Sequence, residues 1–82
     1  MLEIHKDFLR AYAHSVDISE EDPEKIIETL CDNNYYTGES DKQFSSMLYG
    51  YLWGKTNDFV YANIASGVLL HRMNLVYYKD KP

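Results

Sequence analysis

The chain has 82 residues, of which 45% are hydrophobic and 26% are charged, and its formal net charge is −5. A chain of this length buries one core and leaves too little for a second, so we predict a single domain spanning residues 1–82. These fractions are those of a globular chain and argue against an intrinsically disordered one. The acidic balance disfavours nucleic acid as a partner, because such binding depends on Lys and Arg that neutralise phosphates.

The cysteine content and the length of the longest uncharged run indicate the cellular compartment of the protein. The one cysteine, Cys31, cannot form an intramolecular disulfide, and charged residues interrupt the first ten positions, where a secretory signal would lie. Both features favour a reducing cytoplasm. The uncharged run from Phe59 to Leu70 has 12 residues, fewer than the roughly 20 that span a bilayer, so we predict no membrane association.

Two helices are predicted in the acidic half of the chain. Apolar residues at offsets of three and four predict an amphipathic helix over about residues 2–16. Asp22-Pro23 is a typical helix start. The Asp side chain accepts hydrogen bonds from free N–H groups of the first turn, and the N–H group that proline lacks would have no partner at the first helical position. The second helix therefore covers about residues 23–32.

A third helix is predicted over about residues 41–53. Ser40 and Gln43 have the spacing of a capping box, in which each side chain satisfies a free backbone N–H group. Apolar side chains follow at the offsets of a buried helix face. Gly54 is the residue expected just beyond the helix end, where glycine is favoured.

A fourth helix is predicted over about residues 57–73, with Asn57 and Asp58 as candidate caps. It is apolar nearly all round, which is typical of a helix buried on several sides. Its Gly67 lowers helix stability and so indicates close approach by a neighbouring helix. Strand-forming side chains favour a short extended segment over 74–79, with continued helix as the alternative. The predicted fold is an all-α bundle of four helices around the central C-terminal helix.

No catalytic, metal-binding or nucleotide-binding pattern occurs in the sequence. The three histidines lack metal-ligand spacing, no nucleophile has an adjacent base, and there is no glycine-rich phosphate loop. We therefore predict that the protein is not an enzyme and uses no metal or other cofactor.

The charges are distributed unevenly along the chain. Residues 1–41 hold eleven acidic and three basic side chains, a net charge of −8, whereas residues 42–82 have a net charge of +3. Around the second helix, offsets of three and four place acidic side chains on one face. This face is suited to a basic protein surface, such as the nucleic-acid channel of an enzyme, with a solvated helix face as the alternative. These candidate binding residues are Glu21, Glu24, Glu28 and Asp32.

Tyrosine is over-represented, with eight residues in the chain. Tyr and Trp dominate binding hot spots because they bury large areas at a small loss of rotamer freedom. Adjacent tyrosines cannot both point into one core, which indicates that at least one exposed pair contacts a partner. The alternative is simple packing of a thin domain. The candidate contact residues are Tyr35, Tyr36, Tyr49, Trp53, Tyr77 and Tyr78.

Together these features predict a small acidic protein-binding module, a regulator or inhibitor of a larger protein machine. The composition is of a style found in phage and mobile-element proteins that block host enzymes or defence systems, an analogy of composition alone. One alternative is a helix-turn-helix-like DNA-binding regulator, in which the third helix would contact DNA with few Lys and Arg. A second is a homo-oligomeric structural or accessory protein, with an exposed aromatic patch as a homodimer interface.

Overall fold

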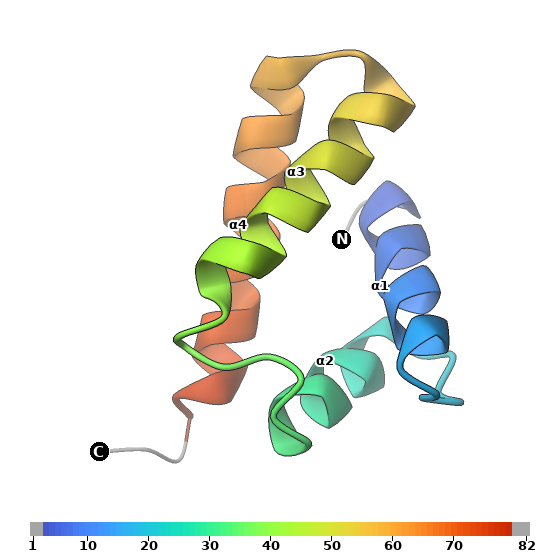
Figure 1. Cartoon of the computed structure of the whole chain (residues 1–82), viewed down its shortest axis with the longest axis vertical. Helices are drawn as coiled ribbons and strands as arrows, with labels where there is room; N and C mark the ends of the chain where they lie inside the picture. The colour runs from blue at the N-terminus through green and yellow to red at the C-terminus, as the bar shows by residue number, and fades with distance from the viewer. Residues whose placement is uncertain (1–2, 80–82) are drawn as a thin grey trace.

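The computed structural model describes residues 3–79 and shows, over that range, four α-helices joined by turns and loops (Figure 1). The predicted all-α four-helix fold is confirmed. α3 and α4 form a long antiparallel hairpin, and α1 and α2 pack against it (Figure 1). The helices are α1 (Glu3–Ser15), α2 (Pro23–Asp32), α3 (Asp41–Thr56) and α4 (Phe59–Tyr77).

The caps of α2 and α4 agree with the prediction. The Asp22 carboxylate accepts a hydrogen bond from the Glu24 N–H group at 3.1 Å, and proline follows at the first helical position. The Asp58 carboxylate accepts one from the Tyr61 N–H group at 3.1 Å. Each acid also lies at the positive end of its helix dipole, which adds to the stabilisation.

The predicted start of α3 at Asp41 is confirmed, but the predicted capping hydrogen bond and the predicted end of this helix are wrong. Ser40 is the N-cap residue, but its side chain makes no capping hydrogen bond, because the hydroxyl instead accepts from the Thr37 N–H group at 2.8 Å and donates to the Thr37 carbonyl at 3.0 Å. At the other end, α3 continues past Gly54 to Thr56 and is closed by Asn57 in a left-handed conformation, with φ of 53°. Asn adopts this conformation more readily than most residues, so glycine is not needed there.

The extended segment predicted after residue 73 is also wrong within the described residues, because α4 continues to Tyr77. Met73 is buried, and Val76 and Tyr77 pack against the core at the helical spacing of three and four residues. Burial of these side chains outweighs their preference for extended backbone, which is a weak and context-dependent effect.

The core lies between the four helices, and every helix contributes to it. Leu9, Leu30, Leu48 and Leu69, one from each helix, expose no more than 1% of their surface. The aromatic rings of α1 and α3 meet edge to face, with Phe8 and Phe44 centroids 5.5 Å apart. Such contacts contribute beyond the buried area itself.

α4 is buried along only one of its faces, contrary to the prediction. It packs mainly against α3 and α2 through Ala62, Ala65, Ser66, Leu69, Leu70 and Met73. On the opposite face Val60, Ile64, Val68 and Leu75 expose 54, 63, 54 and 60% of their surface. Gly67 is also exposed, and a Cβ atom there would meet nothing within 4 Å among the described residues. The close approach expected at Gly67 is therefore not made by another helix of the described chain.

The buried His5 couples stability to pH. This side chain of α1 is 3% exposed, and its Nε2 atom has no hydrogen-bond partner within residues 3–79. Burial lowers the pKa of His5 below its ordinary value of 6.5, an effect that a backbone hydrogen bond to Ala65 opposes. The neutral imidazole is therefore the form that the folded state favours.

We expect the free energy of unfolding to fall as the pH decreases below about 6.5. The pKa of His5 is lower in the folded state than in the unfolded state, so the unfolded chain binds more protons in that range. Urea denaturation across this pH range measures the effect in the wild type and in His5→Gln, which removes the titrating group. His14→Gln, at an exposed position, is the matched control and should keep the wild-type slope. Equal slopes for the wild type and His5→Gln would contradict the prediction.

Candidate partner-binding surface

Three aromatic side chains, two of them exposed, form a row at the end of the α3–α4 hairpin. The Tyr49 and Trp53 rings are stacked, with centroids 6.2 Å apart and an interplanar angle of 19°. The Trp53 ring also lies against Phe59, at a centroid distance of 5.8 Å. Trp53 and Phe59 expose 42% and 53% of their surface, while Tyr49 is half-buried and packs against the core. Tyr49, Trp53 and Phe59 are called the aromatic row below.

Local geometry explains how the aromatic row is assembled. Tyr49 and Trp53 are four residues apart on α3, so their side chains lie one above the other on one helix face. The left-handed Asn57 then reverses the chain, and its N–H group donates to the Trp53 carbonyl at 2.8 Å. This tight connection brings Phe59, the first residue of α4, beside the indole.

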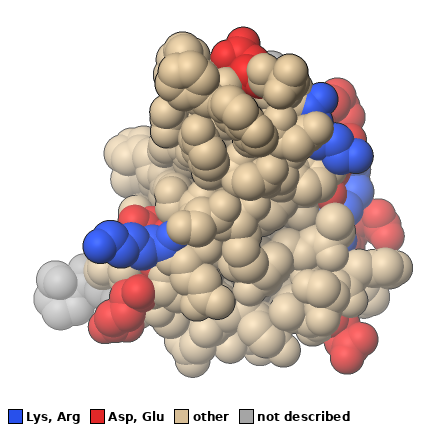
Figure 2. Space-filling model, turned by 45° about the horizontal axis from the view of Figure 1, so that its top comes forward, with Lys and Arg blue, Asp and Glu red and all other residues tan. Residues whose placement is uncertain are grey.

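The hairpin that carries the aromatic row is almost free of charge. The sequence has no Asp, Glu, Lys or Arg from Gln43 to Gly54 or from Phe59 to His71. Figure 2 shows the result as a broad face without charged side chains, which lie around its margin. At the hairpin end, the Lys55 ammonium lies 5.5 Å from the centroid of the Tyr51 ring. A partner can therefore cover this face without desolvating many charges.

Tyr36 lies in the loop between α2 and α3 but is buried, so the prediction that it is an exposed contact residue is wrong. None of its surface is exposed, and its ring packs edge to face against Phe44 at 5.4 Å and Tyr77 at 6.3 Å. Its hydroxyl lies 2.7 Å from carboxylate Oδ1 of Asp41 and 2.7 Å from amide Oδ1 of Asn74. Tyr36 thus joins the loop after α2 to α3 and α4, and it is a core residue.

The other predicted tyrosines lie at the opposite end of the α3–α4 hairpin from the aromatic row. Tyr35 is exposed in the loop that precedes α3. Tyr78 is exposed and its ring lies 4.8 Å from that of the half-buried Tyr77. Tyr77 is the last residue of α4 and Tyr78 follows it, whereas Phe59 is the first residue of this helix of 19 residues, which is about 28 Å long. One compact partner site therefore does not include all the predicted aromatic residues.

The predicted acidic residues are all exposed, and three of them follow one another along α2. Glu24, Glu28 and Asp32 lie on this helix at offsets of four, and Glu21 precedes it. Glu24 also forms an ion pair with Arg72 of α4 within the same chain. Glu28 and Asp32 take part in none of the ion pairs found among the described residues.

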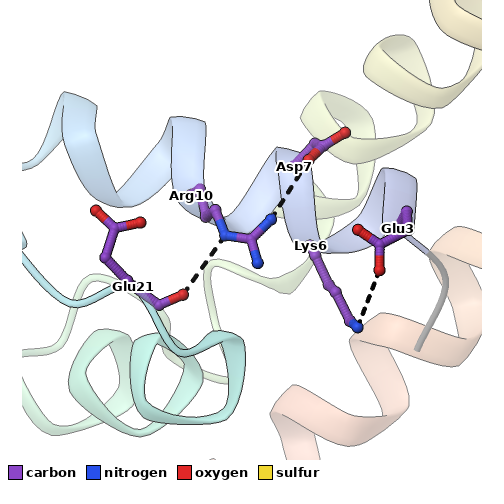
Figure 3. Close-up of polar contacts among 5 residues, drawn as sticks. All are labelled: Glu3, Lys6, Asp7, Arg10 and Glu21. Carbon is purple, nitrogen blue, oxygen red and sulfur yellow. Dashed lines mark hydrogen bonds and ion pairs between the residues drawn. The ribbon is translucent and has the colours of Figure 1, made fainter.

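Basic side chains of α1 are held by neighbouring acids and do not gather into a patch. Lys6 pairs with Glu3 at 3.1 Å, and Arg10 pairs with Asp7 at 3.4 Å (Figure 3). The Arg10 Nε–H group also donates to the Glu21 backbone carbonyl at 3.5 Å, which ties α1 to the turn before α2 (Figure 3). Exposed pairs of this kind contribute little to stability, although they neutralise the charge locally.

Sequence reasoning missed Phe59 as a surface residue, because it assigned the whole apolar run of α4 to the core. An apolar helix has the same pattern whether one or several of its faces are covered.

Among residues 3–79, no three His, Cys, Asp or Glu side chains converge as metal ligands, and no helix is long and apolar enough to cross a membrane. No family model, curated protein or solved structure matches the chain.

Proposed function

We propose that this protein is a small protein-binding module that contacts its partner through the aromatic row. The observation that carries the proposal is the stacked and exposed Trp53, held between Tyr49 and Phe59 on an uncharged hairpin. A ring that is already held by its neighbours loses little rotamer freedom on binding. An exposed Trp in such a setting is typical of interface hot spots.

The acidic α2 supports a partner that also has a basic surface. Glu28 and Asp32 are exposed on it and would speed association with positive charge, although they contribute less to the lifetime of a complex. In this proposal the module regulates or inhibits a larger machine in the cytoplasm. Its composition is of the style of phage and mobile-element inhibitors, so the favoured partner class is a host nucleic-acid-handling or defence enzyme.

A protein partner is better supported than DNA. α3, which would be the recognition helix of a DNA-binding domain, carries Lys42 and Lys55 near its two ends, and the Lys55 ammonium lies over the Tyr51 ring. Its exposed middle is uncharged. Binding to duplex DNA depends on several cations that contact phosphates, and its affinity falls steeply with salt.

Replacing Trp53 with alanine should weaken partner binding by at least about 30-fold, the loss typical of a hot-spot residue. The wild-type protein would first capture its partner from the extract of its own cell, and calorimetry would then compare the purified complexes. Met47→Ala is the matched control, because Met47 is an exposed apolar residue of the same helix outside the aromatic row. Thermal melts would show whether both variants remain folded.

Two outcomes would contradict the proposal. One is that Trp53→Ala binds the partner as tightly as Met47→Ala does, which would remove the aromatic row from the interface. The other is recovery of duplex DNA whose binding is lost as salt rises, which would favour the DNA-binding alternative.

A further inference from the structure

The exposed face of α4 forms a largely apolar stripe along the helix, interrupted by one histidine. Its residues are spaced at offsets of three and four, with Gly67 and Val68 adjacent at the centre, and this spacing places them on one side of a helix. All of them are exposed, and each of the four apolar side chains shows more than half of its surface to solvent. We call this set the outer stripe; it consists of Val60, Ile64, Gly67, Val68, His71 and Leu75.

The electrostatics of α4 favour an uncharged occupant for the outer stripe. Arg72 is the one Lys, Arg, Asp or Glu residue between Phe59 and Tyr77, and it pairs with Glu24 on α2, away from the stripe. A charged surface that covered the stripe would lose its hydration without gaining a counter-charge. The occupant is therefore an apolar surface of similar length, and the outer stripe itself has this character.

The positions of the outer stripe are symmetric about its centre. Counted from the midpoint between Gly67 and Val68, Val60 and Leu75 are equally far away, and so are Ile64 and His71. An antiparallel copy related by a twofold axis at this midpoint would place Val60 opposite the partner's Leu75. It would likewise place Ile64 opposite the partner's His71. A surface of this kind is complementary to itself, as twofold dimers require.

The centre of the outer stripe has room for a close contact. A Cβ atom at Gly67 would meet nothing within 4 Å among residues 3–79, so no neighbour in the described chain requires glycine there. In the antiparallel arrangement the partner's Val68 would occupy this space. The two helix dipoles would also oppose each other, which places the N-terminus of each helix beside the C-terminus of its partner.

We propose that the outer stripe of α4 binds the outer stripe of a second copy of this chain, antiparallel, about a twofold axis between Gly67 and Val68. Stable interfaces bury about 800 Å² on each partner, and one face of a single helix supplies less. The dimer is therefore weak and forms with increasing protein concentration. The aromatic row is a separate surface, so dimerisation does not depend on the function proposed for it.

Sedimentation equilibrium tests the proposal on the full chain. The wild-type mass should rise from 9.6 kDa towards about twice that value as the concentration increases. Ile64→Glu should remain monomeric, because it places a charge in the centre of the apolar contact. Met47→Glu adds the same charge at an exposed apolar site on α3 and should dimerise like the wild type.

Cysteine crosslinking tests the antiparallel register. Under mild oxidation, a mixture of Val60→Cys and Leu75→Cys proteins should form disulfide-linked dimers, whereas neither variant alone should do so. The wild type is the control for the buried Cys31. Self-crosslinking of Val60→Cys would instead show a parallel pair and would overturn the proposal.

Two further results would also overturn it. One is a wild-type protein that stays monomeric at all concentrations tested, which would assign the outer stripe to a different partner. The other is an Ile64→Glu variant that dimerises as the wild type does, which would place the contact elsewhere. Trp53→Ala can lose the partner proposed above while still dimerising, so the two proposals fail independently.

Discussion

Replacement of Tyr36 with alanine is expected to lower the free energy of unfolding by about 3–5 kcal/mol, the range found when a large buried aromatic side chain is removed. The ring of Tyr36 is fully buried and fills the space between Phe44 and Tyr77. Small domains have a total stability of only about 5–15 kcal/mol. Tyr36→Ala should therefore be largely unfolded at temperatures where the wild type is folded.

The Tyr36 hydroxyl contributes separately from the ring. It has one proton, and the Asp41 carboxylate, 2.7 Å away, is the stronger acceptor of its two neighbours. Burial and this hydrogen bond raise the pKa of Tyr36, so the hydroxyl stays protonated throughout the ordinary pH range. Tyr36→Phe keeps the ring and should lose only about 1.5–3 kcal/mol, as expected for a hydrogen bond to a charged group.

Thermal melts and urea titrations of the wild type, Tyr36→Ala and Tyr36→Phe measure the contributions of the ring and of the hydroxyl to stability. A loss of 1 kcal/mol lowers the melting temperature of a domain of this size by about 4–8 °C, so the two variants should be well resolved. Tyr35→Ala is the matched control, because Tyr35 is the adjacent residue and is exposed. A Tyr36→Ala protein as stable as Tyr35→Ala would contradict the burial of Tyr36.

Leu48→Ala is expected to destabilise the protein by about 2–5 kcal/mol, the second large effect. Leu48 is fully buried on α3 where the helix faces the core. The loss combines the removed apolar burial with the cavity that remains, since the surrounding helices relax only partly.

The neighbouring residue on α3 provides the control. Met47 is 37% exposed, and Met47→Ala should change the stability by no more than about 1 kcal/mol. Urea unfolding of both variants measures the difference directly. Equal losses for the two variants would show that α3 presents a different face to the core from the one described.

The aromatic row and the outer stripe lie on two different surfaces of the same hairpin. The first is defined by ring stacking across the α3–α4 connection, and the second by helical spacing along α4. A dimer through the outer stripe would present two copies of the aromatic row to a partner. Such a bivalent module can gain avidity if the partner has two sites within reach.

The sequence by itself determined the four helices, the first residues of α2 and α3, and the caps of α2 and α4. α2 has the predicted bounds, because Asp22 and Pro23 act on backbone groups within one turn of themselves. Asp58 caps α4 for the same reason. The stacking of Tyr49 on Trp53 also follows from their four-residue spacing on one helix. Each of these features depends on residues that are close in the chain.

Only the tertiary structure decided which apolar and aromatic side chains are covered. Of two adjacent tyrosines in one loop, Tyr36 is buried and Tyr35 is exposed, because Phe44 and Tyr77 come from distant elements to enclose the Tyr36 ring. The apolar α4 is covered on one face alone, since α2 and α3 pack there and none of the described residues covers the outer stripe. Burial depends on neighbours that are far apart in the sequence, whereas caps and helical spacing do not.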